Sequence, residues 1–384
     1  MLRDKTAVST VLGMDNRSEE ADLVSGTVRA IENFYVDNRG ALVPRAVPTL
    51  VAQHSESYHS LFAVSTGTVL CMRGTTLCHL INGVPTTVGT VEYGDEGVTY
   101  AEQNNRVFLG AGSNLYVYHE GLLSPVGVRR PDFCELVPSS DKPHLPKGVY
   151  AIAATAVVGD EESPPVYLGE YEADGVHSLR VSAPTPIRVY STAVNGAQYM
   201  QQPDNQVLGA DGAPMLTEEY ELQPAGEALG FYKSRLVSAC SGYLIFGEPF
   251  VAGYFRPSEG IIPVEGEIRM LACLDDAVFY ADASGTWVLR GNELDSLSRE
   301  RVAAPRALFC KSTYMRATEF ASKQVPAESG TVAVWLTDYG YVVGMSTGNV
   351  VLLQDQRIRL PESSAGCVGV VTTGTHTSVI SGMN

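Results

Sequence analysis

The chain has 384 residues, 45% of them hydrophobic and 18% charged, and a formal net charge of −16 from 27 Lys and Arg against 43 Asp and Glu. The apolar content is high enough to build a core, which excludes intrinsic disorder. The acidic balance excludes a protein that grips nucleic acid by neutralising phosphates, and it disfavours binding to anionic membranes. The length fits two or three domains, or one large all-β ring.

The first eight residues carry charge but no apolar core of signal-peptide length. The longest apolar stretches, such as residues 150–158, are shorter than the about 20 residues that cross a bilayer as a helix. We therefore expect a soluble protein that is synthesised in the cytoplasm and not inserted into a membrane.

Short apolar runs separated by polar, Gly-containing turns dominate the chain, and long 3.6-residue periodicity is almost absent. The run pairs are 61–64 with 69–71, 107–109 with 115–118, 236–237 with 243–246, 278–280 with 287–289, and 341–343 with 350–352. The turn glycines Gly67 and Gly112 are 45 residues apart, and Gly242 and Gly285 are 43 apart. A period of about 40–45 residues with four short strands is typical of a β-propeller blade.

The sequence therefore predicts an all-β fold, a propeller of about six four-stranded blades with five to seven allowed. Packing in a ring buries the blade faces and leaves only short strand edges. The interval from Gly112 to Gly242 spans 130 residues, about three periods, and the longer interval before Gly348 places an insertion near residues 310–330. A pair of β-sandwiches is the alternative fold.

Composition divides the chain into four parts: an N-terminal arm over residues 1–27, propeller blades over 28–136, a linker with a β insert or an irregular blade over 137–225, and the remaining blades over 226–384. The linker at 137–146 is rich in Pro. The four predicted strands after it form either a blade or a small sandwich. We also expect the strand at 30–36 to complete the last blade.

Two motifs resemble catalytic signatures. Residues 282–287 (DASGTW) invite comparison with the Asp-box of sialidase-type propellers, but Gly285 directly precedes Thr286, so the register is wrong. Residues 344–348 (GMSTG) match G-x-S-x-G, yet a strand-like run follows where a nucleophile elbow needs a helix. Both motifs are predicted to be hairpin turns of blades.

The sequence contains few residues that could form a metal site or a reactive thiol site. His54, Glu56 and His59 are predicted to lie in a solvated loop rather than to bind a metal. The seven cysteines include no C-x-x-C pair. If Gly74-Thr75 is a two-residue turn, Cys71 faces Cys78, either as two small buried residues or as a disulfide. We predict no catalytic residue, cofactor or metal site, and therefore a protein that is not an enzyme.

Acidic residues cluster between Gly159 and Gly175, a stretch that holds no Lys or Arg. Three interpretations stay open: a solvated rim, a negative surface that repels DNA in a conduit, and a calcium site. The candidate channel or rim acids are Asp160, Glu161, Glu162, Glu170, Glu172 and Asp174.

The order of several short segments resembles the β-propeller tail proteins of tailed bacteriophages, the nozzle or tail-hub components. The segments are 13–16 (GMDN), 30–45 (AIENFYVDNRGALVPR), 159–165 (GDEESPP), 188–192 (RVYST), 235–239 (RLVSA) with 244–249 (LIFGEP), and 334–340 (VWLTDYG). The resemblance implies a structural protein of the virion tail, a homo-hexameric ring that forms part of the DNA-ejection conduit. It also implies contacts with the tail adaptor and fibres, passage of DNA without specific binding, and no catalytic residues.

Two other functions are considered. A receptor- or glycan-binding propeller at the tail tip requires exposed aromatic rings at one blade end, and a propeller glycosidase requires convergent carboxylates in a central pocket. The aromatic candidates are Tyr35, Tyr93, Tyr100 and Tyr339.

Overall fold

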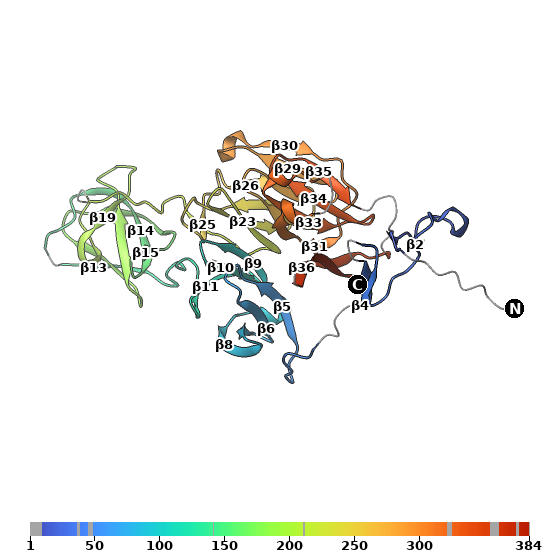
Figure 1. Ribbon diagram of the computed structural model, residues 1–384. Helices are drawn as coiled ribbons and strands as arrows, with labels where there is room; N and C mark the ends of the chain where they lie inside the picture. Colours follow the sequence, from blue (N-terminus) through green and yellow to red (C-terminus); the bar gives the residue numbers. More distant parts are fainter. Residues whose placement is uncertain are drawn as a thin grey trace.

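The computed structural model describes residues 10–36, 39–44, 49–140, 142–209, 212–320, 325–353, 361–373 and 376–383. The described chain is built of strands and short 3-10 turns. Figure 1 shows an arc of sheets and, set apart from it, a smaller β unit formed by the middle of the chain. Of the segments that carry the resemblance, Asp37, Asn38 and Arg45 lie outside the described residues.

Five four-stranded antiparallel sheets form the arc, and each is an up-and-down meander. In four of them the strands follow one another along the chain, whereas in blade 3 the strand β25 (Tyr254–Phe255) comes between the third and the fourth strand. We number these blades 1 to 5 in chain order. They are β5 (Tyr58–Ala63), β6 (Val69–Arg73), β7 (Thr76–Ile81) and β8 (Val84–Thr90); β9 (Thr99–Gln103), β10 (Arg106–Ala111), β11 (Asn114–His119) and β12 (Leu122–Pro125); β22 (Ala228–Tyr232), β23 (Arg235–Cys240), β24 (Tyr243–Phe246) and β26 (Ile261–Pro263); β27 (Met270–Cys273), β28 (Val278–Ala281), β29 (Thr286–Arg290) and β30 (Ser298–Arg301); β32 (Thr313–Arg316), β33 (Thr331–Leu336), β34 (Tyr341–Met345) and β35 (Val350–Leu353).

Each blade buries its faces against its neighbours. Separate hydrophobic cores join blade 1 to blade 2, blade 2 to blade 3, blade 3 to blade 4 and blade 4 to blade 5. In the last of these, the fully buried Trp335 packs against Phe279 with ring centroids 5.5 Å apart. The predicted all-β propeller is confirmed by this arrangement.

A sixth sheet of three strands follows blade 5. In it β31 (Phe309–Lys311) runs parallel to β36 (Ala365–Thr373), which forms a hairpin with β37 (His376–Met383). Val368, Val370 and Val379 pack this hairpin on the core of blade 5. The described part of the arc therefore contains five four-stranded blades and one three-stranded sheet, and the predicted number of about six four-stranded blades is not confirmed.

The strand predicted at 30–36 does not complete the last blade, contrary to our expectation. Its ordered part, β3 (Phe34–Val36), pairs with β4 (Leu42–Pro44) in a separate two-stranded sheet. Upstream, β1 (Gly13–Met14) pairs in parallel with β2 (Thr27–Val28). In the described residues β3 therefore has β4 as its partner, rather than a strand of blade 5 or of the three-stranded sheet.

A two-sheet sandwich occupies the interval between blades 2 and 3, at the left of Figure 1. Its core holds Tyr150, Ile152 and Leu179, all fully buried, and shares no residue with the blade cores. The three periods counted from Gly112 to Gly242 are thus not three blades. The strands are β13 (Glu135–Ser139), β17 (Ser178–Ser182) and β20 (Gln206–Val207) in one sheet, and β14 (Gly148–Val158), β15 (Glu161–Glu162), β16 (Val166–Ala173), β18 (Ile187–Ser191) and β19 (Met200–Gln202) in the other.

Short elements connect the sheets. β21 (Glu221–Leu222) pairs with β25 (Tyr254–Phe255) beside blade 3. The insertion predicted near residues 310–330 includes two of the 3-10 turns, between β32 and β33. The turns are η1 (Glu20–Asp22), η2 (Gly94–Glu96), η3 (Pro203–Asn205), η4 (Leu294–Ser296), η5 (Ala317–Glu319) and η6 (Ala327–Ser329). Within the described ranges, no helix has the length and apolarity to cross a membrane.

Two turn predictions are confirmed. Arg73 pairs with Thr76, so Gly74-Thr75 is a two-residue turn, and Cys71 faces Cys78 across it. Both thiols are free and buried, the simpler of the two interpretations. The G-x-S-x-G motif spans the end of β34 and the turn into β35, so it is a hairpin.

A glycine lies at each close approach between consecutive blades. A Cβ at Gly89 would lie 3.0 Å from Leu123 of blade 2, and one at Gly110 would lie 2.9 Å from Ala225, next to blade 3. At the next two junctions, a Cβ at Gly230 would lie 2.4 Å from the sulfur of Cys273, and one at Gly344 would lie 2.8 Å from the ring of Phe279. Side chains at these positions would push the blades apart.

We expect Gly230→Ala to lower the free energy of unfolding by about 1–3 kcal/mol, because the new methyl group overlaps the sulfur of Cys273. Urea denaturation measures the change. In the double variant with Cys273→Ala the overlap with the sulfur is gone and the Cβ of residue 273, at 3.0 Å, remains the nearest atom. The two changes should therefore couple favourably by about 1 kcal/mol. Gly369→Ala is the control, since the nearest atom to its Cβ is 3.8 Å away. Additive effects of the two changes would contradict the proposed contact.

The turn between β28 and β29 is organised by Asp282, which is 3% exposed. One carboxylate oxygen accepts hydrogen bonds from the Ser284 amide and hydroxyl, at 2.9 and 2.6 Å, and from the Trp287 indole at 3.2 Å. Arg299 lies 3.6 Å from the other oxygen and stacks on the Trp287 ring at 4.3 Å. The predicted blade turn is confirmed, and its carboxylate holds the turn and the next strand together.

Burial acts to raise the pKa of Asp282, but the hydrogen bonds from Ser284, Glu265 and Trp287 outweigh it and lower the pKa below 3.8. The charged carboxylate therefore stabilises the fold fully above that ordinary value, and the stabilisation is lost as pH falls through the lowered pKa. We expect Asp282→Asn to cost about 2 kcal/mol at pH 7.

Urea denaturation at pH 7 and at pH 3 measures this cost, and the difference from the wild type should be smaller at pH 3. The control is Asp275→Asn, which changes an exposed carboxylate in the β27–β28 turn. A cost that is the same at both pH values would show that the charge of Asp282 does not hold the turn.

Candidate functional site

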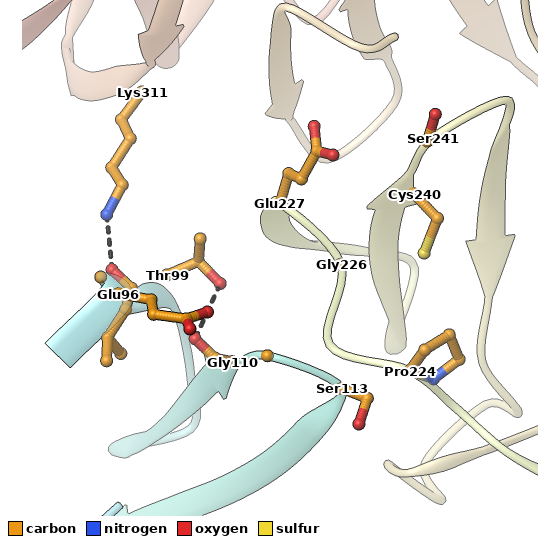
Figure 2. A pocket seen from close by; sticks show the side chains of 13 residues that line it. Glu96, Thr99, Gly110, Ser113, Pro224, Gly226, Glu227, Cys240, Ser241 and Lys311 are labelled. Atoms are coloured by element: carbon orange, nitrogen blue, oxygen red, sulfur yellow. Dashed lines mark hydrogen bonds between the residues drawn. The ribbon is translucent and has the colours of Figure 1, made fainter. Parts of the chain in front are cut away.

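A pocket of about 570 Å³ opens where blades 2 and 3 and the strand β31 converge. Figure 2 shows its walls, which are turns and strand ends rather than sheet faces. The side chains that give it chemical character are Glu96, Thr99, Ser113, Glu227, Cys240, Ser241 and Lys311. We call it the axial pocket.

Lys311 crosses the axial pocket. Its ammonium donates a hydrogen bond of 2.5 Å to the carbonyl oxygen of Val98, just before β9, and lies 5.9 Å from the centroid of the Tyr100 ring. Although Lys311 is exposed as a whole residue, the protein around its ammonium desolvates it and lowers its pKa. The contact connects the sixth sheet to blade 2, so Lys311 closes the arc of blades across its centre.

The thiol in the pocket is not activated. Burial, helped by the nearby charge of Glu227, raises the pKa of Cys240 to about 11. The thiolate is the reactive form, so Cys240 stays a protonated, weak nucleophile at neutral pH. Burial, and then the charge of Glu267, also raises the pKa of Glu227 itself.

Two carboxylates, Glu96 and Glu227, line the pocket. In Figure 2 Glu96 turns toward Gly110, whereas Glu227 points away from it on another wall. Glycoside hydrolysis needs two carboxyl groups on either side of one bond. The two side chains do not face a common point in this way.

The six candidate acids all lie on the sandwich, away from the axial pocket. Asp160 and Glu161 are exposed at the β14–β15 turn, and Glu170 and Glu172 are exposed on β16. Asp174 caps the next turn, where hydrogen bonds from the Val176 amide and from His177 lower its pKa to about 2. The exposed acids therefore lie at three places on the sandwich: the β14–β15 turn, the strand β16 and the turn that follows β16.

Glu162 is not one of these exposed acids. Its side chain is 12% exposed, and its carboxylate lies 2.8 Å from the Arg188 guanidinium. It also accepts hydrogen bonds from the hydroxyls of Tyr190 at 2.7 Å and Thr155 at 2.5 Å. Glu162 therefore has a structural role in the sandwich, and it is the least exposed of the six candidate acids.

The predicted aromatic candidates divide into two kinds. Tyr93 and Tyr339 are 56% and 53% exposed. Tyr35 is partly buried on β3, and Tyr100 stacks on Phe62 with centroids 5.0 Å apart, where burial raises the pKa of its hydroxyl. Only the first two are therefore accessible to a ligand among the four.

A further exposed aromatic residue, not predicted from the sequence, is Phe250, which is 88% exposed in the turn after β24 and has a left-handed backbone with φ 65°. No sequence signal distinguishes it, because a single Phe beside strand-like runs is equally typical of a core position.

Of the predicted solvated loop, His54 and Glu56 are exposed, whereas His59 is partly buried on β5, and Glu56 also lies 3.7 Å from Arg73. His54 and Glu56 are 3.9 Å apart, and the ring of His59 faces the Gly74 carbonyl at 3.3 Å. Across the described part of the chain, His, Cys, Asp and Glu form no cluster of three or more that could hold a metal ion.

No protein-family model matches the chain, and no curated protein matches it in sequence. Among solved structures it is similar to a streptogramin B lyase, with a TM-score of 0.36 and 9% identity over 87% of this chain and 96% of that one. It is also similar to BBS1N in complex with ARL6DN (0.32, 12%, over 85% and 92%) and to apo AztD from Citrobacter koseri (0.27, 11%, over 80% and 90%). The assignment of the fold rests on the sheets described above.

We expect Lys311→Met to loosen the closure of the arc, because the variant loses the only charge-assisted hydrogen bond described between β31 and the start of blade 2. The free energy of unfolding should fall by about 1 kcal/mol, and amides of residues 97–103 should exchange hydrogen faster. Lys147→Met on the sandwich controls for the loss of a charge. Unchanged exchange at 97–103 would rule out the closing role.

Proposed function

We propose that the chain is a structural protein of a bacteriophage tail, a nozzle or hub that assembles as a homo-oligomer, forms part of the DNA-ejection conduit and anchors neighbouring tail proteins. The observation that carries the proposal is that four of the segments that resemble this family contact one another in two pairs.

Two pairs of these segments make such contacts. Glu162, in the 159–165 turn, pairs with Arg188, in the 188–192 strand, at 2.8 Å, and Tyr190 of the same strand adds a hydrogen bond. In blade 3, Arg235 donates a 3.0 Å hydrogen bond to the carbonyl oxygen of Gly247, which joins the two halves of another quoted motif. These contacts give residues of the quoted segments a structural role, in the sandwich and in blade 3.

The exposed acids of the sandwich suit a DNA conduit. Asp160, Glu161, Glu170 and Glu172 present carboxylates on one domain of a chain with a net charge of −16. Like charges repel the phosphates of DNA, so a duplex can slide past such a surface without sticking to it.

An apolar patch on blade 1 suits assembly. Ile81 pairs with Val84 at the β7–β8 turn, and Val51 lies beside Gly83 in the same turn. With Leu50, which is 76% exposed, these side chains present apolar area at the outer edge of the blade. Contiguous exposed apolar area marks protein–protein contacts, and we assign this patch to the contact with the next subunit.

The test is immunogold electron microscopy of phage particles from the source host, with antibody raised against the recombinant chain. We expect gold particles at the tail, between the head and the fibres. A pre-immune serum is the control for background. Protein that stays in the lysate with no gold on the particles would contradict the proposal.

A further inference from the structure

A second cavity of about 450 Å³ adjoins the axial pocket and shares Ser113 and Pro224 with it. It lies between the segment that leaves blade 1, the β10–β11 turn of blade 2 and the segment that enters blade 3. We call it the junction groove. The polar and aromatic side chains that line it include Glu92, Tyr93, Asn114, Arg129 and Gln223.

Tyr93 is displayed in the groove at an energetic cost. Its backbone is left-handed, with φ 59° and ψ 19°, a conformation that costs a bulky L residue about 1–2 kcal/mol. Tyr93 is 56% exposed, so burial in a core does not offset that cost. It lies over Gly112, where a Cβ would come within 3.1 Å of the ring. A strained, exposed residue of this kind indicates function rather than packing.

Three polar side chains beside Tyr93 hold one another in place. Asn114 donates a 3.0 Å hydrogen bond to Glu92 and accepts one of 2.9 Å from Arg129. The Arg129 guanidinium lies 3.8 Å from the Glu92 carboxylate. Because Arg129 carries five donors and Glu92 two acceptor oxygens, the network keeps further donors and acceptors for a ligand.

The network is accessible, and its support is rigid. The side chains of Arg129 and Glu92 are 71% and 64% exposed. The Tyr116 hydroxyl accepts a hydrogen bond from the Glu92 amide, which fixes the main chain there. On the other wall, Gln223 is 3% exposed and donates to the Leu236 carbonyl at 2.9 Å. The groove is therefore formed before any ligand arrives.

The chemistry of this arrangement selects the ligand class. A flat aromatic face accepts the polarised C–H groups on one side of a pyranose ring. Planar amide, carboxylate and guanidinium groups at its edge bind pairs of neighbouring hydroxyls. The charges of Glu92 and Arg129 cancel, which disfavours an acidic sugar. We propose that the junction groove binds a neutral glycan chain.

The test uses the purified full chain on an array of immobilised oligosaccharides with neutral and sialylated members, followed by calorimetric titration of the tightest neutral one. Tyr93→Asn removes the ring and keeps a residue that tolerates the left-handed backbone. Tyr93→Trp keeps an aromatic face, and Asn114→Ala breaks the polar network. The matched control is Tyr243→Asn, an exposed Tyr of blade 3 outside the groove.

We expect binding of a neutral oligosaccharide that Tyr93→Asn and Asn114→Ala each weaken about tenfold or more, whereas Tyr93→Trp and Tyr243→Asn bind like the wild type. The melting temperature of Tyr93→Asn should not fall, since Asn tolerates the left-handed backbone, and those of Tyr93→Trp and Tyr243→Asn should stay close to that of the wild type. Binding of none of the neutral members, binding of sialylated members alone, or undiminished binding by Tyr93→Asn would each overturn the proposal. Because the array uses isolated protein, these outcomes are independent of whether the chain is part of a virion.

Discussion

The structure depends on one constraint: a four-stranded sheet has apolar faces that it can bury only against another sheet. The four cores that join blades 1 to 5 satisfy this constraint pair by pair. Glycines such as Gly230 and Gly344 allow the sheets to approach closely enough for it to hold. At the end of the arc, the three-stranded sheet covers blade 5, and Lys311 connects that sheet to blade 2.

The same constraint determines where the two cavities and the acidic surface can lie. Packing covers the sheet faces, and the axial pocket and the junction groove form where turns and strand ends of different blades meet. The sandwich has its own core, which contains no residue of the blades. Its acidic surface is therefore not needed to bury a blade face. The surfaces that we propose for assembly and for glycan binding therefore lie on different parts of the chain.

The local features of the fold could be predicted from the sequence because a Gly turn between two apolar runs leaves few alternatives. The Cys71–Cys78 register and the Asp282 turn follow from such turns. The sandwich could not be told from blades, since strands alternate with the same period of two in both. The burial of Glu162 depends on its contact with Arg188, which is 26 residues away in the sequence. The exposure of Tyr93 depends on a left-handed backbone. Neither feature can be predicted from composition or from the spacing of residues.

The central claim is that the chain is a structural part of a tail. The most direct test is electron microscopy and plaque assay of particles from a phage that carries a nonsense codon in this gene. The account predicts DNA-filled heads that lack the distal tail, do not infect, and regain both properties when the wild-type chain is supplied. Particles with complete tails and wild-type infectivity would contradict it.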